Sequence, residues 1–280
     1  MECSLPDVQN SFDYRNIPIN RVGVGNVPFT LKVRTKKGTS ISVFSIIDVF
    51  SSLPKDIRGT NMSRYLEVLY TWPYPLTGDN IKDFLKKLKE RVNSEDVYLK
   101  ATFNYPIKVS APKSKLSGDV FFEASFIGLL SEKEYKFYVG VKGDVTSYCP
   151  CSKELSLIGK EVGKGAHAQR GQVAVLTLTD PPQPGIWIED IAEIIRNSGS
   201  SKVYPILKRV DEKYVTEEGY SNAKFVEDIA RDVTLALQKI KKLKWFSVKV
   251  VNFESIHQHN AICYIFREKV NNNWIPSHSL

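Results

Sequence analysis

Residues 222–266 have the sequence NAKFVEDIARDVTLALQKIKKLKWFSVKVVNFESIHQHNAICYIF, in which one helical pattern is followed by two strand patterns. Apolar residues recur every three or four positions through 222–242, the spacing that places them on one face of an α-helix. They are Phe225, Val226, Ile229, Val233, Leu237 and Ile240, and Ser221 is placed to cap this helix. Residues 246–253 and 261–266 are rich in Val, Ile, Phe and Tyr, which favours strands.

The segments that precede this stretch repeat the same order of elements in two halves. In the second half, strands are predicted at 135–145 and 173–179 and a further helix at 188–196. The first half has strand patterns at 29–33 and 41–49, helical patterns at 62–69 and 81–92 (the second with Asp79 as cap), and strand patterns at 97–109 and 120–127. Each half therefore approximates ββααββ, an α+β module in which two helices cover an antiparallel sheet. Residues 149–171 and 181–185 interrupt the second half, and a loop as long as the first is usually functional or disordered.

The composition is that of a chain with a substantial hydrophobic core. Of the 280 residues, 42% are hydrophobic and 25% are charged, which excludes a disordered or low-complexity chain. No run approaches about 18 apolar residues, and the first residues lack the basic and apolar regions of a signal peptide, so we expect a cytoplasmic protein. The formal net charge of +8 suits an anionic partner, and it leaves nucleic acid, a membrane surface and a phosphorylated metabolite open.

A cysteine pair lies at the start of the long loop. Cys149 and Cys151 flank Pro150, and Lys153 follows them. A thiolate at this place is a good soft metal ligand or nucleophile, and a nearby cation favours it. The single intervening residue differs from the two-residue spacing of zinc ribbons and redox dithiols. Two ordinary structural cysteines would explain the pair equally well.

Two histidines lie close together between the last two predicted strands. His257 and His259 are two positions apart and follow Glu254. In an extended chain both imidazoles point to the same face and could meet one ion, although such a pair is often only surface decoration. Combined with a Cys and a further His, such as His167 in the Gly-rich segment 165–171, the set suits zinc or a similar divalent ion. Glu254 could serve as a ligand, an orienting group or a general base.

Two further segments place basic residues where polar sequence gives way to an apolar run. Residues 58–64, RGTNMSR, have the pattern of a helix entry, and their two Arg could equally hold a phosphate there. The same two interpretations apply to residues 207–209, Leu-Lys-Arg.

Together these fragments resemble the prokaryotic type IB GTP cyclohydrolase I family over roughly residues 20–270. The matching motifs are CPCSKE at 149–154, GAHAQR at 165–170, VTE at 215–217 followed by Tyr220, and ESIHQHNA at 254–261. The segment RGTNMSR is also similar to the family's Gly-Thr-His-Met-Ser-Arg segment. Two positions depart from the family pattern: Asn61 stands where a His is common, and Lys202 stands where some members have a glutamate.

The resemblance implies the tunnelling fold (T-fold), with two tandem ββααββ modules, antiparallel sheets and helices on one face. It places an N-terminal tail at 1–27, modules at 28–131 and 132–270, and a C-terminal tail at 271–280. Subunits of the family form homotetramers with active sites between subunits, and no nucleic-acid or membrane partner is implied. The implied reaction converts GTP and water to 7,8-dihydroneopterin triphosphate and formate, the first step towards folate-type pterins and, in many bacteria, towards queuosine precursors.

The resemblance also implies roles for individual residues. The metal positions are Cys149, Glu254, His257 and His259, for a divalent Zn, Mn or Fe ion without an organic cofactor, and the catalytic residues are Cys149, His167, Glu254 and His257. Glu217 is implied as the anchor of guanine, where a carboxylate accepts hydrogen bonds from N1 and the 2-amino group. The implied contacts of the triphosphate are Lys153, Arg170, Lys208 and Arg64. A divalent ion lowers the pKa of bound water to about 7, and an imidazole or carboxylate then moves protons to the ring nitrogens.

Two alternatives remain beside this hypothesis. Within the same fold, a nitrile reductase of queuosine synthesis would form a thioimide through a Cys and would need NADPH, whereas Glu254 and the two His beside Cys149 favour metal-assisted hydrolysis. In a different class, a nucleic-acid-binding protein could use Cys and His for a structural zinc with four protein ligands. The sequence has no interleaved basic and aromatic motif in support of that reading.

Overall fold

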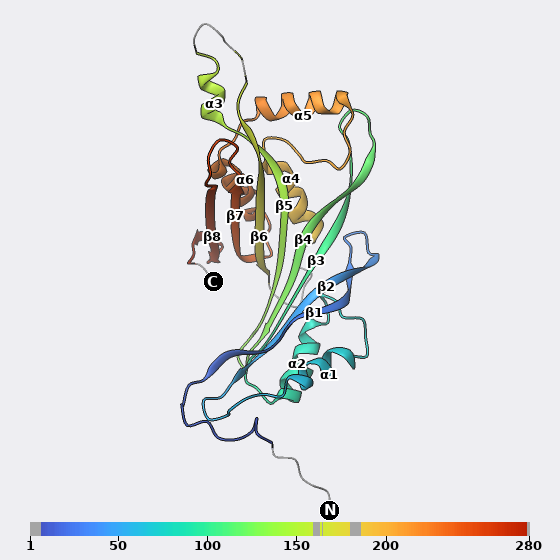
Figure 1. Ribbon diagram of the computed structural model, residues 1–280, viewed down its shortest axis with the longest axis vertical. Coiled ribbons are helices and arrows are strands. Elements are labelled where there is room, and N and C mark those ends of the chain that lie inside the picture. Colours follow the sequence, from blue (N-terminus) through green and yellow to red (C-terminus); the bar gives the residue numbers. More distant parts are fainter. Residues whose placement is uncertain (1–6, 159–162, 164, 180–185, 279–280) are drawn as a thin grey trace, which may run out of the picture. The chain divides into compact units, whose positions relative to one another are not determined.

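The computed structural model describes residues 7–158, 163, 165–179 and 186–278, and Figure 1 shows its elements. The chain forms two compact units. The N-terminal unit holds the residues up to Phe103 together with Ser125–Tyr138, and the C-terminal unit holds Asn104–Ala124 together with the residues from Val139 onward. The strand order follows the sequence, from β1 to β9, and the pairs β1–β2, β2–β3, β6–β7, β7–β8 and β8–β9 are antiparallel.

The elements from the N-terminus to the middle of the chain are β1 (Ile19–Arg34), β2 (Ser40–Leu53), α1 (Met62–Tyr70), α2 (Ile81–Val92), β3 (Val97–Ser110) and β4 (Ser117–Leu130). The remaining elements are β5 (Tyr135–Tyr148), α3 (Pro150–Leu155), β6 (Ala168–Thr179), α4 (Ile188–Ser198), α5 (Arg209–Ser221), α6 (Val226–Gln238), β7 (Leu243–Asn252), β8 (Ala261–Val270) and β9 (Asn273–Pro276). The order ββααββ of the first half is confirmed, and the second half keeps it with α3, α5 and β9 added.

The N-terminal unit is held together by the apolar faces of α1 and α2 against the sheet. Strand β2 buries every second residue, because alternate side chains of a strand point to opposite faces. Helix α2 buries Ile81, Phe84, Leu85, Leu88 and Val92, the stripe that its sequence spacing predicts. The helix lies so close to β4 that a Cβ added at Gly128 would be 2.6 Å from Ile81 Cγ2 and 2.9 Å from Leu85 Cδ1. A larger residue at this glycine would push the helix away from the sheet.

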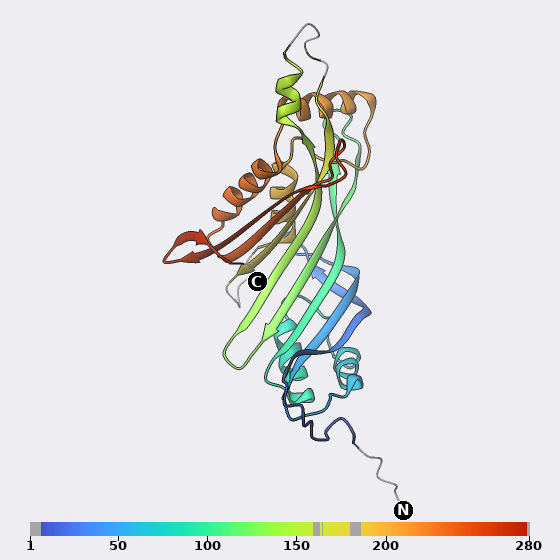
Figure 2. The same ribbon diagram turned by 60° about the vertical axis from the view of Figure 1, so that its left-hand side comes forward.

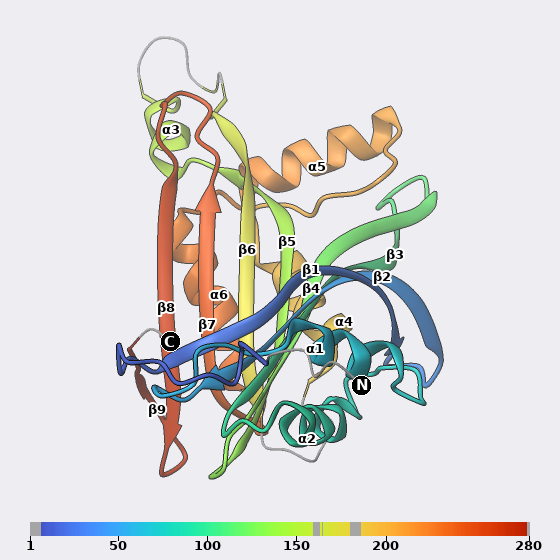
Figure 3. The ribbon, with the colours of Figure 1, turned by 60° about the horizontal axis from the view of Figure 1, so that its bottom comes forward.

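In the C-terminal unit, α4 and α6 lie on one face of the strands (Figures 1 and 2). Helix α6 buries Val226, Ile229, Ala230, Val233 and Leu237, and α4 buries Ile191, Ala192 and Ile195. Strands β6 and β7 contribute Val173, Val175, Phe246, Val248 and Val250 to this core. Figure 3 shows β6, β7 and β8 running side by side, and Ile262 and Tyr264 of β8 are exposed on the strand's other side.

Several details of the predicted elements were wrong at their ends. The N-cap of α2 is Asn80 and not Asp79, and Asn80 uses its side chain on Thr77 and Pro75 rather than on the helix. Helix α6 begins at Val226 and not after Ser221, because Ser221 is the last residue of α5. The helix also ends at Gln238, with Lys239 as its C-cap, and so it is shorter at this end than the predicted 222–242.

The segments expected as tails contain strand residues. β1 begins at Ile19, inside the segment 1–27, and β9 lies inside the segment 271–280. The boundaries 28–131 and 132–270 of the two modules stay predictions. The compact units are divided differently, because β3 and β4 each contribute residues to both.

Candidate active site

The cysteine, histidine and glutamate motifs of the second half meet at one edge of the sheet in the C-terminal unit. β5 ends just before Cys149, β6 starts just after His167, and β7 ends just before Phe253. In an antiparallel sheet the end of one strand lies beside the start of the next, so these three chain segments become neighbours. Two backbone hydrogen bonds hold them together: Cys149 N donates to His167 O at 3.1 Å, and Phe253 N donates to Arg170 O at 3.0 Å.

Cys149 is the N-cap of the short helix α3 and is half-buried. Its Sγ accepts a hydrogen bond from the backbone N–H of Ser152 at 3.4 Å, and Pro150 occupies the first position of the helix, where it fits without loss of a hydrogen bond. The loop 149–171 thus contains a helix at its start. Ser152 also links this helix to the second motif, because its Oγ accepts from the backbone N–H of His167 at 3.2 Å.

His167 connects the cysteine motif with the loop that follows β7. Its Nδ1 lies 3.0 Å from Gln169 Oε1 and 3.4 Å from Ser255 Oγ. Ser255 is next to Glu254, so the imidazole of His167 borders the third motif. The three motifs that lie 15 to 88 positions apart in the sequence are therefore joined by direct contacts.

The loop 254–260 is bent rather than extended, so the expectation of an extended chain through the two His was wrong. The imidazoles nevertheless lie side by side, because the rings of His257 and His259 are nearly parallel with centroids 5.1 Å apart. Both residues are exposed. The two rings were expected to lie on one side of an extended strand. A bent loop brings them together instead.

The fit of these residues to a metal ion depends on their chemistry. Among the described residues, no three His, Cys, Asp or Glu side chains converge as a metal-binding group. The donors predicted at this edge are the thiol of Cys149, the imidazoles and the carboxylate of Glu254, which are the ligand types that Zn²⁺ and similar divalent ions accept. The donor set therefore fits a divalent ion, and which of these side chains bind it stays a prediction.

Helix α5 was not predicted, and it runs to the same end of the C-terminal unit as α3 (Figure 1). Lys153 Nζ donates to Ser221 O at 3.2 Å and lies 5.1 Å from the centre of the Tyr220 ring. The hydroxyls of Ser156 and Tyr220 are 3.3 Å apart. Helix α5 also carries Glu217, whose exposed carboxylate is 3.5 Å from Lys213 Nζ. The predicted guanine anchor is thus on a helix whose C-terminal end contacts the cysteine motif.

A buried aspartate that the sequence reasoning missed fixes the start of α5. Asp211 is fully buried and accepts three backbone hydrogen bonds, from Lys113 at 2.7 Å and from Ser114 and Lys208 at 2.9 Å. Burial alone would raise the pKa of Asp211, but the hydrogen bonds from Ser114, Lys208 and Lys113 hold the pKa well below its usual range. An acidic residue three positions after a helix N-cap is the signal of a capping box, and it could have revealed this residue.

The other predicted contacts of the triphosphate come from different elements, and they do not all belong to the same unit. Lys208 is the N-cap of α5 and exposed, and Arg170 lies 3.5 Å from Asp144 with most of its side chain exposed. Arg64 belongs to α1 in the N-terminal unit. Of the two departures from the family pattern, Asn61 is the N-cap of α1, where its side chain accepts from Ser63 N, and Lys202 is 3.7 Å from Glu193.

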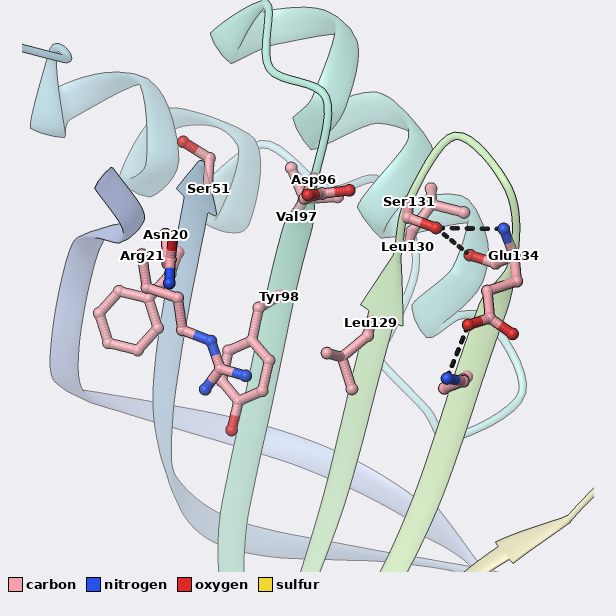
Figure 4. Close-up of a pocket in the computed structure, with 12 residues that line it drawn as sticks. Asn20, Arg21, Ser51, Asp96, Val97, Tyr98, Leu129, Leu130, Ser131 and Glu134 are labelled. Atoms are coloured by element: carbon pink, nitrogen blue, oxygen red, sulfur yellow. Dashed lines mark hydrogen bonds and ion pairs between the residues drawn. The ribbon is translucent and has the colours of Figure 1, made fainter. Parts of the chain in front are cut away.

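A separate pocket of about 270 Å³ lies in the N-terminal unit (Figure 4). The Arg21 guanidinium lies 4.1 Å from the centre of the Tyr98 ring, and Lys136 is paired with Glu134 at 2.6 Å. None of the predicted site residues lines this pocket, and its lining contains neither Cys nor His. The pocket therefore lacks the groups that the proposed metal chemistry would need.

Comparisons with known proteins identify the class of the fold. The structure is similar to the crystal structure of uricase from Arthrobacter globiformis, with a TM-score of 0.56 and 7% sequence identity over 90% of this chain and 94% of that chain. It is also similar to urate oxidase from Bacillus sp. TB-90, with a TM-score of 0.52 and 8% identity over 90% and 100% of the two chains. The antiparallel sheet with helices on one side is a T-fold, as the sequence predicted.

Sequence comparison then identifies the family. Residues 5–263 match the family described as type I GTP cyclohydrolase folE2. The chain is 42% identical over 267 residues to GTP cyclohydrolase FolE2 of Geobacter metallireducens, covering 95% of this chain and 98% of that protein. It is 39% identical over 257 residues to GTP cyclohydrolase FolE2 of Thermosipho africanus, covering 92% and 96%. The chain belongs to the type I GTP cyclohydrolase FolE2 family and is a GTP cyclohydrolase, which confirms the predicted activity.

The family assignment decides between the predicted activity and its alternatives. A nitrile reductase and a structural-zinc nucleic-acid-binding protein were the two other hypotheses, and neither agrees with the match over residues 5–263.

Within the described residues, no helix is both long and apolar enough to cross a membrane.

Proposed function

We propose that the edge formed by the ends of β5, β6 and β7 carries out the metal-dependent conversion of GTP and water to 7,8-dihydroneopterin triphosphate and formate. The observation that carries this proposal is the convergence of three distant motifs. The backbone N–H of Cys149 donates a hydrogen bond to the carbonyl oxygen of His167. The imidazole of His167 in turn contacts the hydroxyl of Ser255, the residue after Glu254. A thiol, several imidazoles and a carboxylate are thereby gathered at one end of the C-terminal unit.

In this proposal, Cys149, His257, His259 and Glu254 supply the ligands of a divalent ion, which is Zn²⁺, Mn²⁺ or Fe²⁺. Such an ion makes a water molecule acidic enough to act as a nucleophile at neutral pH. The protein's part is to hold the donors in place, with Cys149 fixed at the N-cap of α3 by the Ser152 N–H. No organic cofactor takes part in the proposed reaction.

The purine ring has to be held and protonated by side chains. Glu217, exposed on α5, accepts hydrogen bonds from N1 and the 2-amino group of guanine. His167 transfers protons at the imidazole ring of the base, and Glu254 and His257 assist in the same role, which typically contributes ~10² to 10⁴ in rate. After formate leaves, the ribose opens and recloses on the freed amine, and these steps also need acid–base groups.

The triphosphate is bound by cations, of which Arg170 and Lys208 are exposed and Lys153 and Arg64 are half-buried. Lys153, Arg170 and Lys208 supply positive charge in the C-terminal unit, and Arg64 supplies it from the N-terminal unit. We propose that a homotetramer assembles the complete site at subunit interfaces, with no nucleic-acid or membrane partner. The product leads to folate-type pterins or queuosine precursors, and we expect the reaction in the cytoplasm, where GTP is abundant.

The test is a turnover assay with GTP on protein stripped of metal and then restored with Zn²⁺, Mn²⁺ or Fe²⁺ in turn. Product is followed as the fluorescent oxidised pterin, and formate is counted in the same samples. Metal-dependent pterin with equimolar formate is the expected result. Formate without pterin would limit the proposal to ring opening, and full turnover in the stripped protein would refute the metal requirement.

A further inference from the structure

A polar cluster with two buried members and one half-buried member lies directly behind the His167 imidazole. It consists of Ser147 near the end of β5, Gln169 near the start of β6 and Asn252 at the end of β7. Ser147 and Asn252 are 1% and 3% exposed. Ser147 Oγ lies 3.4 Å from Gln169 Nε2, 2.9 Å from Asn252 Nδ2 and 3.1 Å from the backbone carbonyl of Lys224. The cluster thus bridges the three strands whose ends form the site.

The directions of these hydrogen bonds follow from what each group can donate. The carbonyl oxygen of Lys224 can only accept, so the single hydroxyl proton of Ser147 is directed to it. The oxygen of Ser147 then has lone pairs left and can only accept from its two amide neighbours. Gln169 must therefore turn its NH₂ group towards Ser147, which leaves its oxygen, Oε1, facing His167.

This orientation decides which nitrogen of His167 carries the proton. Gln169 Oε1 is an acceptor and lies 3.0 Å from His167 Nδ1, so Nδ1 has to be the N–H donor of this pair. The contact to Ser255 Oγ at 3.4 Å is longer and is compatible with the same arrangement. In the neutral imidazole, Nε2 then keeps its lone pair and is the nitrogen that can accept a proton or bind an ion.

We propose that Gln169, oriented by Ser147, is a positioning residue that fixes His167 in the Nδ1–H tautomer and leaves Nε2 available for chemistry. The part of this inference that concerns catalysis rests on the proposed role of His167 in proton transfer. The tautomer itself does not depend on that role. The principle is the one by which the partner of one ring nitrogen orients the other.

The surroundings of the cluster hold its members in place. Asn252 is paired in register with Gly171, and a Cβ added at Gly171 would lie 2.8 Å from Asn252 Oδ1 and 3.1 Å from Val145 Cγ2. The cluster is therefore closely packed beside Gly171, and a side chain at that position would displace Asn252. The direction of the hydrogen bonds is set by the carbonyl of Lys224, which takes the hydroxyl proton of Ser147 and leaves both amides as donors to it.

The experiment is solid-state NMR of the metal-loaded enzyme labelled with nitrogen-15 histidine, at about pH 8, where an ordinary imidazole is neutral. Protonated and unprotonated ring nitrogens give separate signals, and the chain has only four His. The His167 signals are assigned by their absence from His167→Ala. In the unaltered protein we expect His167 as the Nδ1–H tautomer.

Three variants test whether Gln169 is the cause. Gln169→Leu removes the acceptor and should yield a mixture of tautomers, with kcat reduced roughly 10- to 100-fold and KM for GTP changed less than about threefold. Gln169→Glu keeps an acceptor and should retain the Nδ1–H tautomer. Ser147→Ala frees the Gln169 amide to turn and should weaken the preference. Gln238→Leu, the same chemical change at the end of α6, is the control and should leave both tautomer and rate unchanged.

The outcomes separate this inference from the proposed function. An Nε2–H tautomer in the unaltered protein, or an unchanged Nδ1–H tautomer in Gln169→Leu, would overturn the positioning role. Loss of the tautomer preference in Gln169→Leu but not in Gln169→Glu would establish it. Full activity of His167→Ala would refute the catalytic role of His167, and the NMR result would still decide what Gln169 does.

Discussion

Replacement of Glu217 by Gln tests whether α5 presents the guanine anchor. One of the two hydrogen bonds from guanine to the carboxylate would be lost and replaced by a contact between two donors, since a Gln side chain keeps one acceptor and turns an NH₂ group towards the second guanine donor. A hydrogen bond to a charged group contributes about 1.5–3 kcal/mol, so a loss of about 3 kcal/mol is expected, which is roughly a 10²-fold fall in kcat/KM.

The structure separates this effect from a loss of stability. Glu217 is 63% exposed, and its ion pair with Lys213 at 3.5 Å joins two surface residues that are one helical turn apart. Such pairs contribute about 0.3–0.5 kcal/mol, which corresponds to a shift in Tm of less than about 2 °C. Thermal unfolding of Glu217→Gln should therefore stay close to that of the unaltered protein while kcat/KM falls.

The assay is the initial rate of pterin formation over a GTP titration, with Tm measured on the same preparations. Lys213→Ala is the matched control, because it removes the same ion pair and leaves the carboxylate of Glu217 in place. It should retain kcat/KM within about threefold. A Glu217→Gln enzyme that also stays within threefold would show that Glu217 does not contact guanine in the way proposed.

Three more predictions follow from other parts of the structure. Cys149→Ala should abolish turnover, by about 10³-fold or more, with circular dichroism and oligomer size unchanged; near-normal activity would remove Cys149 from the site. Asp211→Asn should flatten the acid side of the stability profile. Because the pKa of Asp211 is lowered in the folded protein, its carboxylate contributes stability that is fully present above the unfolded-state pKa of about 3.9. That stability is lost as the pH falls towards the lower native pKa. Equal slopes of Tm against pH in Asp211→Asn and the unaltered protein would contradict this role of Asp211. Gly128→Ala should destabilise the N-terminal unit by about 1–3 kcal/mol through overpacking against Ile81 and Leu85, and an unchanged midpoint of chemical unfolding would show that α2 shifts without cost.

Much of the fold could be predicted because most helices bury an apolar stripe. α2, α4 and α6 each place apolar residues three or four positions apart, and these are the residues buried in the core. α5 has no such stripe, since its buried residues are Asp211 and Gly219, and so its pattern gives no helical signal. Its stability comes instead from a buried capping carboxylate and from contacts with loops that are far away in the sequence.

The site could be predicted in its residue types and only partly in its connections. The motifs around Cys149, His167 and His257 carry chemically unusual side chains and were found for that reason. Ser147 and Asn252 are ordinary residues on strands, and their contact joins positions 105 apart in the sequence. Only the pairing of β5, β6 and β7 brings them behind His167, and the sequence of one strand does not show which residues of the other strands become its neighbours.

The division of β3 and β4 between the two compact units has a consequence for how this chain can be made and altered. The polypeptide enters the N-terminal unit, leaves it after Phe103, returns for Ser125–Tyr138 and leaves again. No single cut of the backbone can therefore release either unit intact, and during synthesis the N-terminal unit cannot be complete before residue 138 has left the ribosome. Neither unit can be exchanged with one from another protein unless the parts of β3 and β4 that belong to it are exchanged as well.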